Sequence, residues 1–367
     1  MDVNDALRVT VFFHALEGTG PLWRNGFWPL VNLVSEFGPM HLIEAPWQST
    51  VAARTPVQRV RRRIDLRRHA RALEADVPPE TEPQDLFFAV ALNEQMARLA
   101  AHTVSAMAGR VRHRVLSIFE NVEAESVPVE SWRCFDRITC FCPDLARQIE
   151  AWSGVRTLYW PPHLDTLRFQ SLSAFRPVDL VTVGRGRTDV LFEMQRRSQG
   201  AERFCLDFVT RTQSNRAQSA EAEFRLLFDA LAKSKTTLCF APHDEPRFNG
   251  RSPLLARWVY AWAAGCVVFG TLPRGTGTAA EMDWEGAMVE LPAEVGAAAD
   301  LIEARLDDPD ALRRQGRLNA EEAQRRHDTR YRFAALFDEL GVAHPPALRD
   351  GLAALAARTG QAVSLHG

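Results

Sequence analysis

A short motif in the second half of the chain has residue types that suit the binding of a diphosphate. Gly184-Arg185-Gly186-Arg187 follows an apolar run and precedes a helical pattern. Glycine allows the backbone to approach a ligand closely, a helix N-terminus attracts an anion, and the arginine fork matches phosphate oxygens. Gly184, Arg185 and Arg187 are therefore candidate phosphate-binding residues. A strand-to-helix turn with solvated arginines is the alternative interpretation.

A second candidate region, Ser252–Cys266, has the pattern of a helix with a polar start and a glycine stop. Ser252 is the predicted cap, and the proline after it suits the first turn. Arg257 and Tyr260 lie three residues apart, so a helix would place them on one face. Gly265 ends the predicted helix directly before an apolar run. This face is a candidate ligand site, and a core helix with a glycine stop is the alternative.

Apolar runs alternate with helical patterns along the whole chain. The predicted strands cover residues 9–13, 40–43, 85–90, 114–119, 135–141, 178–183, 203–208, 236–240, 266–270 and 288–291. Strands that alternate with helices favour parallel sheets, and the paired prolines at 161–162 indicate a linker. We therefore predict an α/β fold of two doubly wound, Rossmann-like domains that face a central cleft. Their ligands would lie at the carboxyl ends of the strands.

Domain boundaries follow from this linker and from the helical patterns near the end of the chain. Residues 1–165 form the predicted N-terminal domain, and residues 166–340 form the predicted C-terminal domain. The alanine-rich tail at 341–367 is a candidate helix that packs back on the N-terminal domain. The two predicted halves each contain enough alternating strands and helices for a sheet of their own.

The composition is that of an ordinary globular protein without a strong charge bias. The 367 residues are 46% hydrophobic and 25% charged, and the formal net charge is −2. This balance argues against a nucleic-acid partner. No apolar run reaches the ~18 residues of a membrane-spanning helix, and the acidic start lacks a signal-peptide pattern, so we expect a cytoplasmic protein. The six cysteines show neither a disulfide framework nor metal-site spacing.

Arginines crowd a predicted helix in the segment Arg54–Arg71. The narrow apolar stripe of this helix consists of Val57, Val60, Ile64 and Leu73. A basic helix can lie on anionic lipid or bind an acidic partner. The segment therefore predicts an anionic membrane surface or an acidic partner, and the first of these would place the protein at the inner face of a membrane. A solvated helix with acidic neighbours is the alternative.

The stretch from Arg257 to Val268, with Ala263-Ala264-Gly265 at its turn, resembles the donor-site helix of GT-B glycosyltransferases. The likeness is to the group-1-like branch that includes spore-maturation-protein-like glycosyltransferases. Pro161–Asp165 is similar to the interdomain segment of these enzymes, and Val183-Gly184-Arg185 is similar to the first strand and loop of their donor domain. Asp308–Arg332 is similar to their closing helices. The likeness covers residues 160–340 and is faint before them.

The resemblance implies an enzyme that transfers a sugar from a nucleotide-sugar donor to a glycan, a lipid-linked glycan, a protein or a small molecule. The donor would bind the C-terminal half and the acceptor the N-terminal half, without a metal or a further cofactor. His14 and Glu17 follow the first predicted strand, on a loop that faces the donor in this family, so either is a candidate general base. A surface loop histidine is the alternative for His14. His243 lies in the loop that reaches the donor sugar, and a hydrated loop is the alternative there.

Two departures from the family pattern leave other functions open. Larger relatives carry two glutamates where this sequence has Ser252 and Tyr260, and the second glutamate usually holds the donor ribose. The lysine expected after the phosphate-binding arginine is absent, with Arg187 and Arg196 as candidate substitutes. A scaffold that binds a nucleotide or a glycan without catalysis is therefore one alternative. A sugar-nucleotide epimerase, which shares the fold, is another.

Overall fold

The computed structural model describes residues 6–14, 27–45, 55–79, 82–183, 186–199, 203–208, 219–242 and 248–360. Contacts divide these residues into two compact units. Unit 1 consists of the described parts of 1–20, 31–160 and 337–347, and unit 2 consists of the described parts of 21–30, 161–336 and 348–367. Each unit has a parallel sheet of its own, which confirms the predicted α/β fold class. The predicted functional domains stay a prediction.

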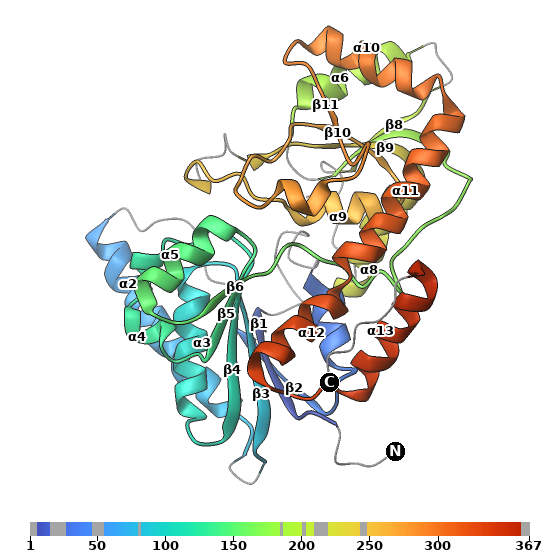
Figure 1. The fold of residues 1–367 in the computed structure, drawn as a ribbon. Helices are drawn as coiled ribbons and strands as arrows, with labels where there is room; N and C mark the ends of the chain where they lie inside the picture. The colour runs from blue at the N-terminus through green and yellow to red at the C-terminus, as the bar shows by residue number, and fades with distance from the viewer. Residues whose placement is uncertain are drawn as a thin grey trace. The chain divides into compact units, whose positions relative to one another are not determined.

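The sheet of unit 1 is wholly parallel, with the strand order β2-β1-β3-β4-β5-β6 (Figure 1). Its strands are β1 (Val9–His14), β2 (Met40–Ala45), β3 (Gln84–Ala91), β4 (Val111–Ile118), β5 (Arg137–Cys140) and β6 (Thr157–Tyr159). The helices between them are α1 (Trp28–Val34), α2 (Pro56–Ala75), α3 (Glu94–Ala106), α4 (Val129–Trp132) and α5 (Pro143–Ser153). Right-handed crossovers in one direction place α2, α3, α4 and α5 on one face of this sheet. The order reverses between β1 and β3, which is the switch point of the sheet.

Local sequence signals explain where the helices of unit 1 begin and end. Thr55 caps α2, because its hydroxyl accepts from the Gln58 backbone NH at 3.2 Å and the Gln58 side-chain oxygen accepts from the Thr55 NH at 3.1 Å. Asn93 caps α3 by accepting from two backbone NH groups of the first turn. Gly154 ends α5 with a φ of +73°, a conformation that glycine adopts without strain. These signals lie within a few residues of each helix end.

The predicted apolar stripe of α2 is wrong. Val57, Val60 and Ile64 leave 77%, 55% and 60% of their surface exposed, whereas Leu73 is only 2% exposed. A helix turns by about 100° per residue, so Leu73 lies on the face opposite the other three. That face packs inward, with Ala70 also buried. The predicted stripe combines apolar residues that lie on two different faces of α2.

The sheet of unit 2 is also parallel, with the strand order β11-β10-β9-β7-β8 (Figure 1). Its strands are β7 (Val178–Thr182), β8 (Cys205–Asp207), β9 (Ser234–Cys239), β10 (Val267–Gly270) and β11 (Val289–Glu290). The helices after β7 are α6 (Thr188–Ser198), α8 (Ala220–Ala232), α9 (Ala256–Ala263), α10 (Val295–Leu306), α11 (Pro309–His327), α12 (Thr329–Leu340) and α13 (Pro346–Thr359). α6 and α10 cover one face, and α8, α9 and α11 cover the other. The order reverses between β7 and β9, which is the switch point of this sheet.

Aromatic side chains fill the core beneath α9. Trp258 and Trp262 of this helix are fully buried. Trp262 donates from Nε1 to the Ala287 carbonyl at 2.7 Å, so its polar atom is satisfied inside the core. The ring centroid of Trp262 lies 4.7 Å from that of Trp284 and 5.5 Å from that of His327. One face of α9 is therefore a core-packing face.

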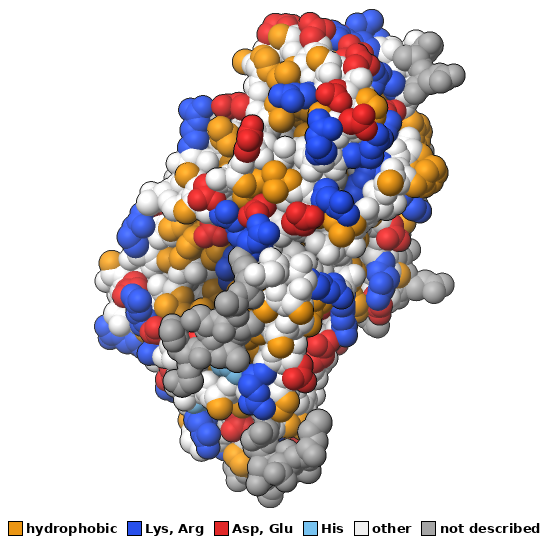
Figure 2. Space-filling model, turned by 45° about the vertical axis from the view of Figure 1, so that its right-hand side comes forward, with side chains coloured by type: hydrophobic (Ala, Val, Ile, Leu, Met, Phe, Trp, Pro, Cys, Tyr) orange, Lys and Arg blue, Asp and Glu red, His pale blue; other side chains and the backbone are white. Residues whose placement is uncertain are grey.

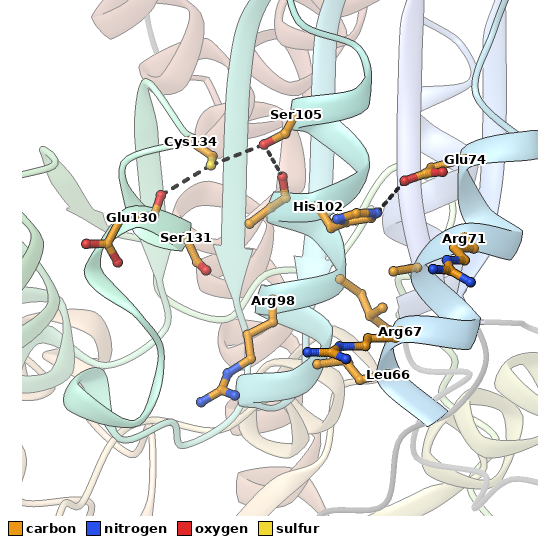
Figure 3. Close-up of a pocket in the computed structure, with 13 residues that line it drawn as sticks. Leu66, Arg67, Arg71, Glu74, Arg98, His102, Ser105, Glu130, Ser131 and Cys134 are labelled. Atoms are coloured by element: carbon orange, nitrogen blue, oxygen red, sulfur yellow. Dashed lines mark hydrogen bonds and ion pairs between the residues drawn. The ribbon is translucent and has the colours of Figure 1, made fainter. Parts of the chain in front are cut away.

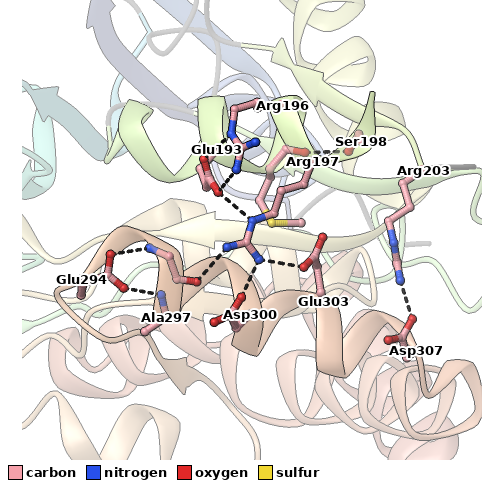
Figure 4. A network of polar contacts seen from close by, with 12 residues as sticks. Glu193, Arg196, Arg197, Ser198, Arg203, Glu294, Ala297, Asp300, Glu303 and Asp307 are labelled. Atoms are coloured by element: carbon pink, nitrogen blue, oxygen red, sulfur yellow. Dashed lines mark hydrogen bonds and ion pairs between the residues drawn. The ribbon is translucent and has the colours of Figure 1, made fainter. Parts of the chain in front are cut away.

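An ion network joins α6 to α10 on the other face of the sheet (Figure 4). Arg197 of α6 donates to Asp300 at 2.6 Å and to Glu303 at 2.8 Å, and both acceptors belong to α10. Its Nε also donates to Glu193 at 2.7 Å. Hydrogen bonds from Arg196 and Arg197 lower the pKa of Glu193 to about 2. The network therefore stays ionised at neutral pH and holds the two helices side by side.

A buried ion triad joins the start of unit 2 to the start of α12. Arg330 donates from Nη1 to Asp165 at 2.8 Å and to Asp328 at 3.2 Å. Thr166 donates to Asp328 from its backbone NH at 2.8 Å and from its hydroxyl at 2.6 Å. The three ionisable side chains are all at least nine-tenths buried. Burial raises the pKa of Asp328, and the charge of Arg330 opposes this rise.

The surface carries both signs of charge. On the face shown in Figure 2, Lys and Arg side chains lie interspersed with Asp and Glu side chains. This distribution agrees with the formal net charge of −2. Within the ranges that the structure describes, none of the helices combines the length and the apolar character that crossing a bilayer requires.

Replacing Arg330 by methionine should strongly destabilise unit 2. We expect Arg330→Met to lower the free energy of unfolding by about 3–5 kcal/mol, because two buried carboxylates lose their counter-charge. Arg313→Met is the matched control, since Arg313 pairs with Asp310 on the exposed surface of α11 and should cost at most about 0.5 kcal/mol. Urea denaturation followed by circular dichroism measures both. Similar losses in the two variants would contradict a structural role for the triad.

His327 makes the stability of unit 2 depend on pH. Burial lowers its pKa to about 3, and the nearby charge of Arg332 adds to the effect. The neutral ring donates from Nε2 to the Glu281 carbonyl at 2.8 Å. In an unfolded chain a histidine binds its proton near pH 6.5. The unfolded state therefore gains protons, and the folded state loses relative stability, as the pH falls below this value.

His327→Gln should weaken this pH dependence, because glutamine keeps a donor for the Glu281 carbonyl but does not titrate. Between pH 7.5 and pH 5 we expect the wild type to lose about 2 kcal/mol more unfolding free energy than the variant. Urea denaturation at the two pH values gives the comparison. Parallel pH profiles for the two proteins would show that folding does not lower the pKa of His327.

Candidate functional site

The switch point between β7 and β9 is the place in unit 2 where the fold itself predicts a ligand. Parallel α/β sheets bind ligands outside the carboxyl ends of their strands, where the strand order reverses. The chain after β7 and the chain after β9 border this point. The predicted site residues that lie outside the described residues are Glu17, Gly184, Arg185 and His243. The structure places the others.

Gly186 and Arg187 shape the side of the switch point that follows β7. A Cβ at Gly186 would lie 2.6 Å from a ring carbon of Phe240, so only glycine lets this segment approach the chain after β9 so closely. Arg187 donates to the Asp189 carboxylate at 2.8 Å and to the Pro292 carbonyl at 3.2 Å. The first bond lowers the pKa of Asp189. Arg187 thus holds the start of α6 to the chain after β11.

The predicted start of the α9 helix is wrong. The helix begins at Ala256, and the residue that precedes it is Leu255, without a side-chain cap. Ser252 is 6% exposed, and its hydroxyl accepts from the Arg274 NH at 2.9 Å. Its carbonyl accepts from the Gly275 NH at 2.8 Å. Ser252 therefore anchors the loop after β10 instead of capping a helix.

Arg257 and Tyr260 lie one turn apart on α9, as predicted, but their side chains have different surroundings. The Arg257 guanidinium lies 5.7 Å from the centroid of the Trp258 ring. Arg257 belongs to the first turn of α9, the helix that follows the carboxyl end of β9 in the chain. Burial raises the pKa of the Cys239 thiol to about 12, and the charge of Arg257 opposes this rise. The Tyr260 ring packs edge-on against Phe224 of α8 at 5.4 Å. Burial raises the pKa of Tyr260, so its phenol stays neutral.

Gly265 lies at the other end of α9, directly before β10. The helical rise places it about 12 Å from Arg257. Its φ is +74°, and a Cβ there would collide with the Arg176 guanidinium and lie 2.8 Å from the Ser171 carbonyl oxygen. A Cβ at Gly316 of α11 would in turn collide with the Gly265 carbonyl. Close packing at the amino edge of the sheet explains this glycine, and a contact with a donor stays a prediction.

The predicted position of His14 on a surface loop is wrong. His14 is the last residue of β1, fully buried and in register with Ala45 of β2. Its ring centroid lies 3.9 Å from that of Phe13. The strand continues one residue beyond the apolar run because the neighbouring strand continues to pair with it. This places His14 at the carboxyl end of β1, beside the switch point of unit 1, and its role as a general base stays a prediction.

The loop after β10 contains a glycine-rich segment that is absent from the predicted site residues. In Gly275-Thr276-Gly277-Thr278, a Cβ at Gly275 would lie 2.6 Å from the Ser252 carbonyl oxygen. Thr278 is fully buried, and its hydroxyl makes no hydrogen bond within the part of the chain that the structure describes. The alternation of glycine and threonine was the signal available in the sequence. The segment adds a buried hydroxyl to the loop that Ser252 anchors.

The carboxyl edge of the unit 2 sheet has the chemistry of an anion site. It presents the guanidinium of Arg257 together with the N-terminal end of α9, whose backbone NH groups carry partial positive charge. Such groups stabilise negative charge on a ligand or a leaving group. Across the described ranges, the side chains of His, Cys, Asp and Glu form no group of three or more that could hold a metal.

Comparison with known proteins identifies a fold. No family model matches the chain, and no curated protein matches it in sequence. A solved α-glucosyltransferase in complex with UDP-glucose and DNA containing an abasic site aligns with a TM-score of 0.56 at 10% identity, over 91% of this chain and 99% of that chain. The N-terminal domain of Candida albicans trehalose-6-phosphate phosphatase aligns with a TM-score of 0.51 at 8% identity, over 96% of this chain and 97% of that chain.

The chain therefore has the fold of the GT-B glycosyltransferases. Both units contain a parallel sheet. Their alignment covers nearly the whole of a glucosyltransferase chain. These two observations confirm the predicted resemblance at the level of the fold. These alignments do not single out the spore-maturation-protein-like branch. Which residues bind a ligand must follow from the chemistry of this chain.

Gly265→Ala should destabilise unit 2 more than a Gly→Ala substitution whose only cost is the positive φ of the backbone. We expect a loss of about 2–4 kcal/mol in unfolding free energy, because the new Cβ would lie 2.8 Å from the Ser171 backbone oxygen, which cannot swing away, and also takes a positive φ. Gly154→Ala is the matched control, since its φ is +73° with open space around the Cβ, and it should cost about 1 kcal/mol. Urea denaturation measures both. Equal losses would mean that backbone conformation alone requires Gly265.

Proposed function

We propose that the protein is a glycosyltransferase that moves a sugar from a nucleotide-sugar donor to an acceptor. The observation that carries the proposal is the alignment of 91% of the chain with a glucosyltransferase that holds UDP-glucose. The donor would bind unit 2 at the switch point between β7 and β9, and the acceptor would bind unit 1. Membership of the spore-maturation-protein-like branch rests on the motifs of residues 160–340. The acceptor is a glycan, a lipid-linked glycan, a protein or a small molecule.

Sugar transfer leaves negative charge on the departing nucleoside diphosphate. Arg257 and the N-terminal end of α9 would stabilise this charge electrostatically. The motif that begins at Gly184 follows β7 at the same edge and is the proposed second phosphate contact. Arg187 of this motif is engaged with Asp189, so Arg185 is the better proposed phosphate ligand of the two arginines.

Recognition of the donor ribose must differ from that of the larger relatives. Ser252 anchors a loop and Tyr260 packs against Phe224, so neither position supplies the carboxylate that those relatives carry. The proposed contacts to the sugar are His243 and the glycine-rich segment that ends at Thr278. His14 and Glu17 are the proposed candidates for the general base. No step of this proposal needs a metal or a cofactor.

A binding scaffold without catalysis is the second candidate function. The contacts of Ser252 and Tyr260 favour such a scaffold. Ser252 accepts a hydrogen bond from the loop after β10, and Tyr260 packs against Phe224, so both side chains have structural roles. Such a scaffold would bind a nucleotide or a glycan without turnover. A sugar-nucleotide epimerase on the same fold would instead convert its nucleotide sugar with no acceptor present. Multiple-turnover consumption of a nucleotide sugar only when acceptors are present supports the transferase.

The donor site can be tested with UDP, GDP, ADP, CMP and dTDP in thermal-shift experiments. One selective nucleotide at 100 times its dissociation constant should stabilise the wild type by about 2.7 kcal/mol. Arg257→Ala should abolish this shift without lowering the melting temperature of the unliganded protein much, because the guanidinium lies at the edge of the core. Arg305→Ala, an exposed residue on α10, should leave the shift unchanged. An undiminished shift in Arg257→Ala would remove Arg257 from the site.

A further inference from the structure

A groove crosses the helical layer of unit 1 and has a volume of about 470 Å³ (Figure 3). The outer face of α3 forms its floor with Arg98 and His102. α2 forms one wall with Arg67 and Arg71, and Glu130 of α4 belongs to the opposite wall. A cavity of this size accommodates a small organic molecule. Nothing in the proposed transferase function uses it.

Arg67 and Arg71 give the α2 wall two positive charges that no described residue neutralises. The two residues lie one turn apart on the helix, and both are exposed. In the described ranges neither one makes a hydrogen bond or an ion pair, whereas Arg114 and Arg137 of the same unit pair with carboxylates. Like charges one turn apart destabilise a helix slightly. The pair therefore does not serve the stability of α2.

The other charges of the groove leave it positive. Glu74 pairs with His102 at 2.7 Å across α2 and α3, so this carboxylate is already engaged. Arg98 donates to the Ser126 backbone carbonyl and is therefore engaged as well. Apart from these engaged groups, the guanidinium groups of Arg67 and Arg71 share the groove with the single carboxylate of Glu130. An anion is the ligand class that this balance favours.

An exposed apolar surface continues the arginine wall toward the start of α2. Val60, Ile64, Arg67 and Arg71 follow one another at spacings of four, three and four residues, which places them on one face of the helix. Val60 is 55% exposed and Ile64 is 60% exposed. A ligand with an anionic group at the arginines would therefore lay an apolar group along these two side chains.

We propose that this groove binds a phosphate monoester that carries an apolar group. A phosphate monoester has nearly two negative charges at neutral pH and three terminal oxygens, which suits two arginine forks. Arg67 and Arg71 hold the phosphate, and Ile64 and Val60 contact the apolar group. The ligand is either a soluble phosphate ester or the head group of a lipid, because both present the same chemistry.

The groove is separate from the ligand edge of its own sheet. α2 begins after the carboxyl end of β2, and Arg67 lies about 16 Å further along the helix axis. The binding of a phosphate monoester here is therefore independent of the proposed donor site in unit 2. Arg257→Ala should leave it unchanged, so failure of one proposal does not affect the other.

Two double variants of the full chain test the arginine wall. Arg67→Gln/Arg71→Gln removes the two proposed ligands, and Arg61→Gln/Arg68→Gln removes the same charge from exposed positions of α2 outside the groove. Isothermal titration with hexyl phosphate at constant ionic strength provides the soluble probe. We expect the first double variant to bind at least about tenfold more weakly than the wild type, and the second to bind within about twofold.

Sedimentation with vesicles distinguishes the two sources of the ligand. The probe vesicles contain phosphatidylcholine with phosphatidic acid, which is a phosphate monoester, and the control vesicles carry equal charge as phosphatidylglycerol, a diester. Val60→Ser/Ile64→Ser adds a test of the apolar wall. Binding to phosphatidic acid that needs both Arg67/Arg71 and Val60/Ile64 assigns a lipid head group. Hexyl phosphate binding that needs the arginines, without vesicle binding, assigns a soluble ester.

Three results would overturn the proposal. The first is equal weakening in the two arginine double variants, which would indicate a general attraction to a basic helix. The second is equal binding to the monoester and diester vesicles together with no binding of hexyl phosphate. The third is a wild-type protein that binds neither probe. Circular dichroism spectra of the variants check that each one keeps its helices.

Discussion

The ion triad of Asp165, Asp328 and Arg330 is the interaction on which the rest of unit 2 depends. Ionised groups lose hydration when they are buried, and only close mutual contacts compensate for that loss. The residues belong to segments more than 160 positions apart, and a parallel bridge between Leu164 and Asp328 holds these segments in register. The sheet and helices that carry the candidate donor site are all built from the chain between these two segments.

The same triad constrains the elements that follow it. A Cβ at Gly351 of α13 would collide with the Arg330 side chain, so α13 packs closely only because that position is glycine. His327, the residue before Asp328, stacks on Trp262 and thereby connects the triad region to the core beneath α9. The start of α12 is therefore held in place by ion pairs, by close packing against α13 and by an aromatic contact with α9.

α9 connects the core of unit 2 to the candidate site at the carboxyl edge of the sheet. The helix crosses the sheet from its carboxyl edge, at Arg257, to its amino edge, at Gly265. Between these ends Trp258 and Trp262 fix the helix in the core. Arg257, in the first turn of α9, is therefore positioned at the carboxyl edge of the sheet by the apolar packing of its helix.

Much of the fold was predictable from the sequence, because two parallel sheets with both faces covered require apolar strands in alternation with helices. It was harder to predict which face of a helix is buried and which partners a single polar residue contacts. The sequence could not separate Leu73 from the exposed Val57 and Ile64, since apolar residues occur on both faces of α2. It by itself determined the fold class and the segments that border the carboxyl edge of the unit 2 sheet, where the candidate site lies. Only the tertiary structure decided that Ser252 anchors a loop and that Asp165 meets Arg330, because the partners lie far away in the chain and packing alone brings them together.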